Sequence, residues 1–254
     1  MGTTWILVAG AGIGLLYGIF GVGSAFATPM LAMLGVPGMA AVVGPLPALL
    51  PGSAVGAWSY SRRGKVDWVV ARRALAGGLP AAVVGALASS RIGGPLLLVL
   101  SGLVLLVVGL RVLRPAAVTE QTRDLAEHRR ASARFVVTTA ALVGFASGLL
   151  ANGGGFLLVP MFLLVLGLDM NEASGTSLVV ASALTVPTLL VHMGLGDIDY
   201  AVAMMFGLGL VPAAYVGARL AVHLPTARLQ SVFGLLLVGF ALWFLVRQAG
   251  VLVI

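Results

Sequence analysis

Long apolar runs separated by short polar stretches follow one another along the chain, five in each half. In the first half they cover Thr4 to Phe20, Ala25 to Leu34, Met39 to Tyr60, Trp68 to Ser90 and Ile92 to Leu113; in the second they cover Phe135 to Leu150, Phe156 to Leu168, Ala173 to Met193, Tyr200 to Val222 and Leu229 to Val246. A helix needs about 20 apolar residues to cross a hydrocarbon core of about 30 Å, so the pattern predicts membrane-spanning helices. The second run of each half is shorter and predicts a half-helix, a re-entrant piece or a strongly tilted short span.

The two halves resemble each other in sequence. A shift of 132 residues places the block Gly64–Trp68 on Gly196–Tyr200 and the block Leu79–Gly85 on Val211–Gly217, while a shift of 130 places Phe26 on Phe156. We therefore predict two homologous transmembrane repeats, residues 1–113 and 135–254, joined by a polar linker, residues 114–134. Many membrane transporters are duplicated in this way and hold their substrate where the repeats meet.

Composition gives the class of protein. Hydrophobic residues make up 60% of the chain and charged residues 9%, against roughly 25% charged in soluble domains. This predicts an all-α integral membrane protein in contact with the lipid bilayer. The chain has no cysteine, which excludes disulfides and thiolate metal sites. Its net charge of +7 comes from short clusters between apolar runs, which indicates membrane topology rather than nucleic-acid binding.

The start of the chain is expected to stay as a helix rather than be cleaved as a signal peptide. Residues 1–5 contain no basic residue, and the run that follows has a counterpart near Phe135 to Leu150. Cleavage would therefore remove half of a repeated element.

Charge in the connecting segments predicts orientation. The linker region from Arg111 to Arg134 holds more arginines than acidic residues, which predicts that the linker lies on the cytoplasmic side of the inner membrane. Two crossings earlier, Arg62, Arg63 and Lys65 fall on the same side, whereas the matched second-half loop carries Asp197 and Asp199. Opposite charges at matched loops favour an inverted over a parallel repeat. Trp58, Tyr60 and Trp68 flank the basic loop and are expected to anchor it at the interface.

Two glycine-rich turns precede the short runs and are the candidate substrate-binding elements. The first consists of Gly21, Val22, Gly23 and Ser24, and the second of Asn152, Gly153, Gly154 and Gly155. When such a turn opens a half-helix, unpaired N–H groups and the positive end of the helix dipole converge on one point, which suits an anion. The alternative is close helix packing, which small residues also allow.

The third run of each half is expected to be interrupted. In the first half the interruption comes from Gly44-Pro45 and from Pro51-Gly52-Ser53, and in the second half from Gly175-Thr176-Ser177 followed by Pro187. The hydroxyls of Ser53, Thr176 and Ser177 are candidate ligands for an oxyanion. The alternative is that they bond to their own helix or to a neighbouring one.

Three further residues are candidates for gating or proton transfer. Pro80 and Pro212 lie near the centres of matched runs and predict kinks, which suit static packing as well as gating. His192 ends an apolar run and fits a proton relay or an ordinary interfacial histidine. Asp67 and Asp199 are predicted to cap the helices that begin after them.

Enzyme motifs are missing from the sequence. It has neither a zinc-protease H-E-x-x-H nor a phosphate-binding G-x-x-x-x-G-K-[ST] motif, so we expect no catalytic residues, no metal and no cofactor. An intramembrane hydrolase would require a serine such as Ser177 to meet His192 in space.

The doubled motif resembles a known family. Gly21–Pro29 and Asn152–Pro160 each join a glycine turn to an apolar stretch and a proline, and the second is followed by Ala173–Leu178. This pattern is similar to the TauE/SafE (sulfite exporter, DUF81) family over essentially the whole chain. In the first half Ser24-Ala25 replaces a glycine pair, and Gly44-Pro45-Leu46 stands where Gly-Thr-Ser-Leu is usual.

The resemblance implies a bacterial or archaeal inner-membrane permease for small sulfur-containing oxyanions, such as sulfite, sulfonates or sulfoacetate, usually moved outward. The residues by themselves reach only an anion-compatible pore. Two alternatives stay open: a drug/metabolite-type carrier of other small solutes, and a non-transporting membrane subunit that docks a sulfur-metabolism enzyme through the linker.

Overall fold

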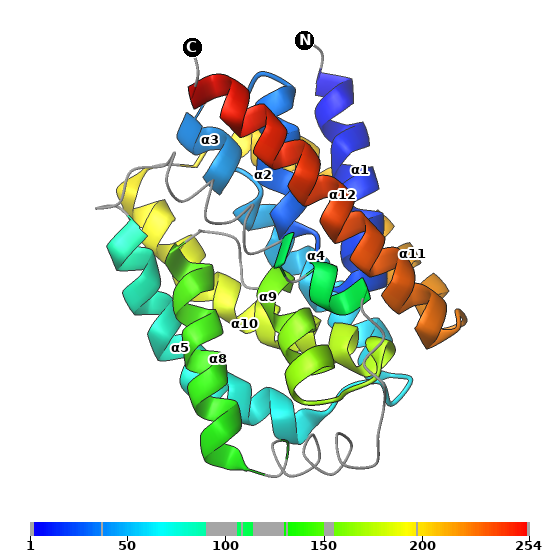
Figure 1. Ribbon diagram of the computed structural model, residues 1–254. Coiled ribbons are helices and arrows are strands. Elements are labelled where there is room, and N and C mark those ends of the chain that lie inside the picture. Colours follow the sequence, from blue (N-terminus) through cyan, green and yellow to red (C-terminus); the bar gives the residue numbers. More distant parts are fainter. Residues whose placement is uncertain are drawn as a thin grey trace.

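The computed structural model describes residues 3–36, 38–89, 106–107, 109–113, 130, 132–149, 155–196 and 198–252. Within these residues every labelled element is a helix (Figure 1). They are α1 (Thr3–Phe20), α2 (Ser24–Met33), α3 (Gly38–Val43), α4 (Leu46–Ser61), α5 (Trp68–Ser89), α8 (Ala133–Leu149), α9 (Gly155–Pro160), the π-helix η1 (Met161–Val165), α10 (Met170–Leu195), α11 (Tyr200–Ala221) and α12 (Thr226–Leu252).

The described part of the chain contains five stretches long and apolar enough to cross a membrane. They are Ala40–Ser61, Trp68–Ala88, Met170–Gly194, Tyr200–Ala221 and Thr226–Trp243. Two further apolar helices, Thr4–Phe20 and Ala133–Leu149, are somewhat shorter. The prediction of an all-α integral membrane protein is confirmed.

The second segment of each half is short, as its apolar run predicts. Helix α2 has ten residues, which corresponds to about 15 Å, roughly half of a hydrocarbon core. Its counterpart is α9 followed by η1, eleven residues in all (6 and 5). The widening to a π-helix begins directly after Pro160, which has no N–H to donate. Helices α2 and α9 contact each other within the molecule.

The predicted interruptions of the third segments hold in one half only. Gly44 and Pro45 separate α3 from α4, as expected. In the second half the prediction is wrong, because α10 runs without a break through Gly175-Thr176-Ser177 and Pro187. Glycine, threonine and serine keep their N–H donors, so the helical hydrogen bonds survive there. Helix α4 likewise continues through Pro51, so the predicted second break of the first half is also wrong.

Two pairs of helices approach each other through glycines. On α1, a Cβ added at Gly14 or Gly18 would overlap the carbonyl oxygens of Leu210 and Ala214 on α11. The pair α8 and α5 shows the same contacts, Gly144 and Gly148 meeting the carbonyls of Gly78 and Ala82. The 130-residue shift found in the sequence places Gly14 and Gly18 on Gly144 and Gly148. The 132-residue shift places Gly78 and Ala82 on Leu210 and Ala214, so the two sets of contacts are equivalent. This agreement supports two homologous repeats, which stay a prediction.

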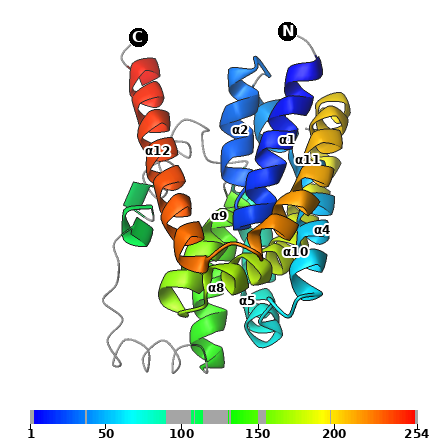
Figure 2. The same cartoon turned by 90° about the vertical axis from the view of Figure 1, so that its right-hand side faces the viewer.

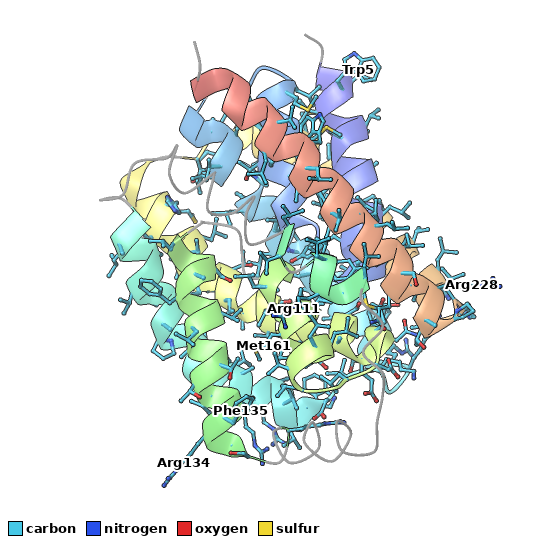
Figure 3. All side chains as sticks on the ribbon, viewed as in Figure 1. Trp5, Arg111, Arg134, Phe135, Met161 and Arg228 are labelled. Carbon is cyan, nitrogen blue, oxygen red and sulfur yellow. The ribbon has the colours of Figure 1, made fainter. Side chains whose placement is uncertain are left out.

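The direction of the helices is consistent with inversion. The start of α1 and the end of α12 lie at the same end of the molecule, and α8 begins at the opposite end (Figures 1 and 2). Trp5 and Phe135, which the 130-residue shift matches, lie at opposite ends in the side-chain view (Figure 3). Matched helices that run in opposite directions are what an inverted repeat requires. This arrangement supports the inverted repeat, which also stays a prediction.

The aromatic residues around the basic loop divide into two groups. Trp58 and Trp68 are about half exposed, at 52% and 51%, as expected of interface anchors. Tyr60 is fully buried, so its predicted role as an anchor is wrong. Its hydroxyl donates instead to the carbonyl of Ile19 at 2.9 Å, which satisfies the polar tip inside the protein.

Candidate substrate site

The first glycine turn lies at a junction of the two halves. Helix α1 ends at Phe20, and Gly21 takes a left-handed conformation with φ of 70° while its N–H donates to the Tyr17 carbonyl at 2.8 Å. A Cβ on Gly21 would lie 3.0 Å from the Ser174 carbonyl oxygen and 3.1 Å from Cγ2 of Val159. The turn therefore fits against both α9 and α10, and a side chain there would be strained in conformation and crowded in space.

Tyr17 connects this turn to α4. The ring is fully buried, and a Cβ on Gly23 would overlap it. The Tyr17 hydroxyl pairs with the side chain of Ser53. Ser53 Oγ in turn donates to the Leu49 carbonyl at 2.8 Å and to the Leu50 carbonyl at 2.9 Å. Ser53 thus bonds back to its own helix, which is the alternative that the sequence left open.

The first turns of α10 complete the neighbourhood. Ser174, Thr176 and Ser177 are all fully buried. Thr176 Oγ1 accepts from the backbone N–H of Asp67 at 3.0 Å, which ties the start of α5 to α10. The Tyr60 ring packs where a Cβ on Gly175 would lie, and the Ser174 side chain lies beside the Tyr60 hydroxyl. The site therefore gathers hydroxyl groups from α1, α4 and α10 beside the Gly21–Gly23 turn.

The other predicted site residues fall into three groups. Asn152, Gly153 and Gly154 lie outside the described residues; Gly155 begins α9 and Ser24 begins α2, and both are described by backbone alone. Val22 is buried within the turn. Pro80 and Pro212 are exposed inside α5 and α11. His192 is buried in the last turn of α10, about 24 Å along the helix from Thr176, so the structure does not bring these last three residues into the hydroxyl cluster.

The buried polar side chains of the described part are hydroxyls, one amide and one imidazole. They are Ser53, Ser59, Ser147, Asn171, Ser174, Thr176, Ser177, Thr185, Thr188 and His192. Among these described residues there is no buried carboxylate, which would repel an anion, and no buried arginine or lysine, which would hold one tightly. A polar solute among these side chains would meet hydrogen-bond donors and acceptors rather than a carboxylate, a lysine or an arginine of the described part.

Sequence reasoning missed Tyr17 and Tyr60 as parts of the site. A signal for Tyr17 was present: a tyrosine inside an apolar membrane run, four residues before Gly21, must find a partner for its hydroxyl. The partner itself could not be named, because it lies on another helix.

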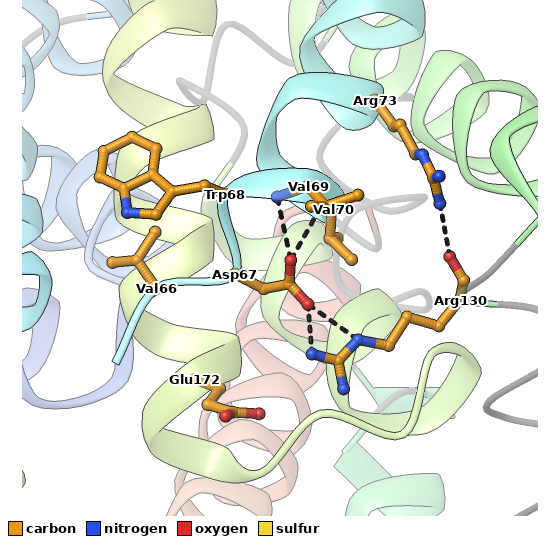
Figure 4. Close-up of a pocket in the computed structure, with 8 residues that line it drawn as sticks. All are labelled: Val66, Asp67, Trp68, Val69, Val70, Arg73, Arg130 and Glu172. Carbon is orange, nitrogen blue, oxygen red and sulfur yellow. Dashed lines mark hydrogen bonds and ion pairs between the residues drawn. The ribbon is translucent and has the colours of Figure 1, made fainter. Parts of the chain in front are cut away.

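Charged residues gather at one end, beside the start of α5. An open hollow of about 670 Å³ is lined there by Asp67, Arg73, Arg130 and Glu172 together with apolar residues (Figure 4). Asp67 accepts from the N–H groups of Val69 and Val70 at 3.0 Å, which confirms it as a helix cap. Two cations face two carboxylates, so this hollow has no net charge to attract an anion.

The pKa of Asp67 reflects these partners. Burial by itself raises the pKa, but the Val70 N–H and the Arg130 guanidinium outweigh burial and hold the pKa below its usual value. Arg130 Nε donates to Asp67 Oδ2 at 2.8 Å, and Arg73 donates to the Arg130 carbonyl at 2.8 Å. The end of the linker is thereby tied to the start of α5.

Helices long and apolar enough to cross a membrane, with polar side chains buried between them, define an integral membrane protein. In agreement with this class, the chain matches the family described as "Sulfite exporter TauE/SafE" over residues 6–244 and belongs to that family. Two relatives from Xylella fastidiosa, strains Temecula1 and 9a5c, are each named "Probable membrane transporter protein"; both are 30% identical over 96% of this chain and 95% of their own length. No solved structure matches the chain. The protein is thus a multi-pass membrane transporter rather than an enzyme.

Proposed function

We propose that this transporter moves small sulfur-containing oxyanions, such as sulfite, sulfonates or sulfoacetate, across the inner membrane. The observation that carries the proposal is the Gly21–Gly23 turn at the start of α2, set among the buried hydroxyls of Tyr17, Ser53 and Ser174 with no buried carboxylate in the described part of the chain. N–H groups at a helix start and neutral hydroxyls suit an oxyanion. The description of the matching family, which names a sulfite exporter, supports the same substrate class.

The second half contributes to this proposal through its own glycine turn. Asn152, Gly153, Gly154 and Gly155 would supply donors in addition to those of Gly21, Val22, Gly23 and Ser24. The contact between α2 and α9 supports a shared site at the meeting of the two halves. Thr176 and Ser177 would donate from α10.

Export of such an anion needs no coupling ion. An inside-negative potential favours outward movement by about 2.3 kcal/mol per charge for each 100 mV, and a dianion gains twice as much. The linker and the basic end of the molecule, with Arg62, Arg63 and Arg219, would face the cytoplasm under the positive-inside rule.

The test is anion flux in proteoliposomes, with sulfite and a short alkylsulfonate as substrates. We expect Gly21→Ala, Asn152→Ala and Gly153→Leu to reduce flux strongly. The matched control is Gly35→Ala: Gly35 also has a positive φ, of 83°, but a Cβ added there would have nothing within 4 Å. Unchanged flux in all three site variants would place the site elsewhere. Uptake of cations or neutral solutes in place of anions would favour the drug/metabolite-type carrier.

A further inference from the structure

A second hollow, of about 470 Å³, opens between the loop after α4 and the end of α11. It is lined by Arg63, Tyr215, Val216, Arg219, Leu220 and His223. Unlike the hollow beside Asp67, it has no carboxylate among its described lining residues. Two guanidinium groups and an imidazole in such a lining suit a phosphate, because arginine pairs with phosphate oxygens through two parallel hydrogen bonds.

The apolar wall of this hollow belongs to a lipid-facing stripe. Val216 and Leu220 continue a row that starts with Met204 and Leu208, at intervals of four residues or a multiple of four. These four side chains are exposed by 64%, 60%, 48% and 51% in chain order. Neighbouring side chains in such a row lie next to each other on the helix surface, so the row forms an apolar strip that winds around α11, and an exposed apolar strip of a membrane helix contacts acyl chains. A ligand in the hollow therefore meets cations at one end and the lipid-facing surface at the other.

Two arginines at the hollow lie over aromatic rings: Arg219, which lines the hollow, and Arg62, the neighbour of Arg63. Trp58 stacks on Tyr215 with 6.2 Å between ring centroids. Arg62 lies over the Trp58 ring and Arg219 over the Tyr215 ring, each with 5.2 Å from Cζ to the ring centroid. His223 Nδ1–H donates to the Arg219 carbonyl at 2.7 Å. Tryptophan and tyrosine prefer the headgroup level of a bilayer, so this stack places Arg219 where lipid phosphates lie.

We propose that this hollow binds the headgroup of an anionic phospholipid, with one acyl chain along the Met204–Leu220 strip of α11. A freely soluble anion would gain nothing from Val216 and Leu220, whereas a phospholipid uses both the cations and the apolar wall. The site lies at the arginine-rich end of the molecule, the end that the positive-inside rule assigns to the leaflet carrying anionic lipids.

Native mass spectrometry of the purified protein tests the proposal, with added phosphatidylglycerol compared with phosphatidylcholine. We expect the wild type to retain phosphatidylglycerol preferentially. Removing one guanidinium should weaken that binding by roughly fivefold, and Arg63→Gln combined with Arg219→Gln by more. Arg72→Gln is the matched control, since Arg72 is exposed on α5, bonds to the Trp68 carbonyl and does not line the hollow.

Equal binding of the two lipids by the wild type would overturn the proposal, and so would equal phosphatidylglycerol binding by the double variant and by Arg72→Gln. Displacement of the lipid by millimolar glycerol phosphate would also overturn it, because it would indicate a site for soluble phosphate esters. Arg219→Lys, which keeps the charge, should retain most of the lipid if charge rather than folding is responsible. Sulfite flux measured in parallel separates this proposal from the proposed function, because either can fail without the other.

Discussion

At the scale of single residues, the two matched aspartates at helix starts differ in their surroundings. Asp67 caps α5 and is paired with Arg130. Asp199 caps α11, accepting from the N–H groups of Ala201 and Val202 at 3.0 and 3.1 Å, which confirms its predicted role. The cap is common to both halves, whereas the bond to Arg130 is made by Asp67. Comparing the same substitution at the two residues therefore separates the effect of the helix cap from the effect of the ion pair.

We expect Asp67→Asn to lower thermal stability more than Asp199→Asn, because asparagine keeps the cap and loses the ionic bond to Arg130. The pKa of Asp67 is lowered on folding, so its stabilising effect is present above the unfolded pKa and is lost as pH falls through the folded one. The difference in melting temperature between wild type and Asp67→Asn should stay constant from neutral pH to about pH 5 and shrink in more acidic buffer. A constant difference throughout the acidic range would contradict the ionic explanation.

Tyr60→Phe is expected to destabilise the protein by about 1–2 kcal/mol, because the Ile19 carbonyl would lose its donor in a buried place. Tyr200→Phe is the control, since Tyr200 is 59% exposed and the change there should be near zero. Thermal unfolding in detergent measures both. Equal effects of the two substitutions would show that the buried hydroxyl of Tyr60 is not needed.

At the scale of helices, close approach of backbones holds α1 against α11 and α5 against α8. Membrane helices gain little from the hydrophobic effect on association, so contact of backbone atoms through small residues is a main source of stability. Gly14 on α1 has the carbonyl of Leu210 where its Cβ would be, whereas Gly12, two residues earlier, has nothing within 4 Å.

The two glycines should therefore respond in opposite directions to alanine. Gly14→Ala should destabilise the protein by pushing α1 from α11, while Gly12→Ala should leave stability unchanged or raise it by up to about 1 kcal/mol through helix propensity. Gly144→Ala on α8, which meets Gly78, should behave like Gly14→Ala if the repeats are equivalent. Melting temperatures of the three variants check this, and a loss of stability in Gly12→Ala equal to that in Gly14→Ala would refute the packing argument.

At the scale of the whole molecule, the inverted repeat makes a prediction about sidedness. Thr4 and Arg134 correspond under the 130-residue shift and lie at the starts of α1 and α8, which begin at opposite ends of the molecule (Figures 1 and 3). An inverted repeat places matched positions on opposite sides of the membrane, and a parallel repeat places them on the same side.

The natural absence of cysteine allows a direct test by single-cysteine labelling. In intact cells, we expect a membrane-impermeant maleimide to label Thr4→Cys and to leave Arg134→Cys unlabelled until the cells are lysed. Labelling of both residues from outside, or protection of both, would rule out the inverted repeat. The labelling pattern also tests the predicted cytoplasmic position of the linker.

How far sequence reasoning reached depends on the range of the interactions concerned. The apolar runs within the described residues, the short second segments, the Gly44-Pro45 break and the caps at Asp67 and Asp199 are local features, and the structure has them; most of the predicted run Ile92 to Leu113 lies outside the described residues. The break of α10 at Gly175 and the interfacial position of Tyr60 were predicted wrongly. Helix α10 continues because Gly175, Thr176 and Ser177 keep their N–H donors, whereas the burial of Tyr60 depends on neighbours from other helices, which the local pattern does not contain.

The apolar content of the chain and its periodic runs by themselves determined that this is a helical membrane protein, because lipid leaves no other way to satisfy the backbone of so many apolar segments. The doubled glycine-proline motif determined the family. Only the tertiary structure decided that Tyr17 reaches Ser53, that the Gly21 turn meets α9 and α10, and that Arg63 and Arg219 share a hollow with a lipid-facing wall. These contacts join segments far apart in the chain, so their partners are set by helix packing and not by sequence spacing.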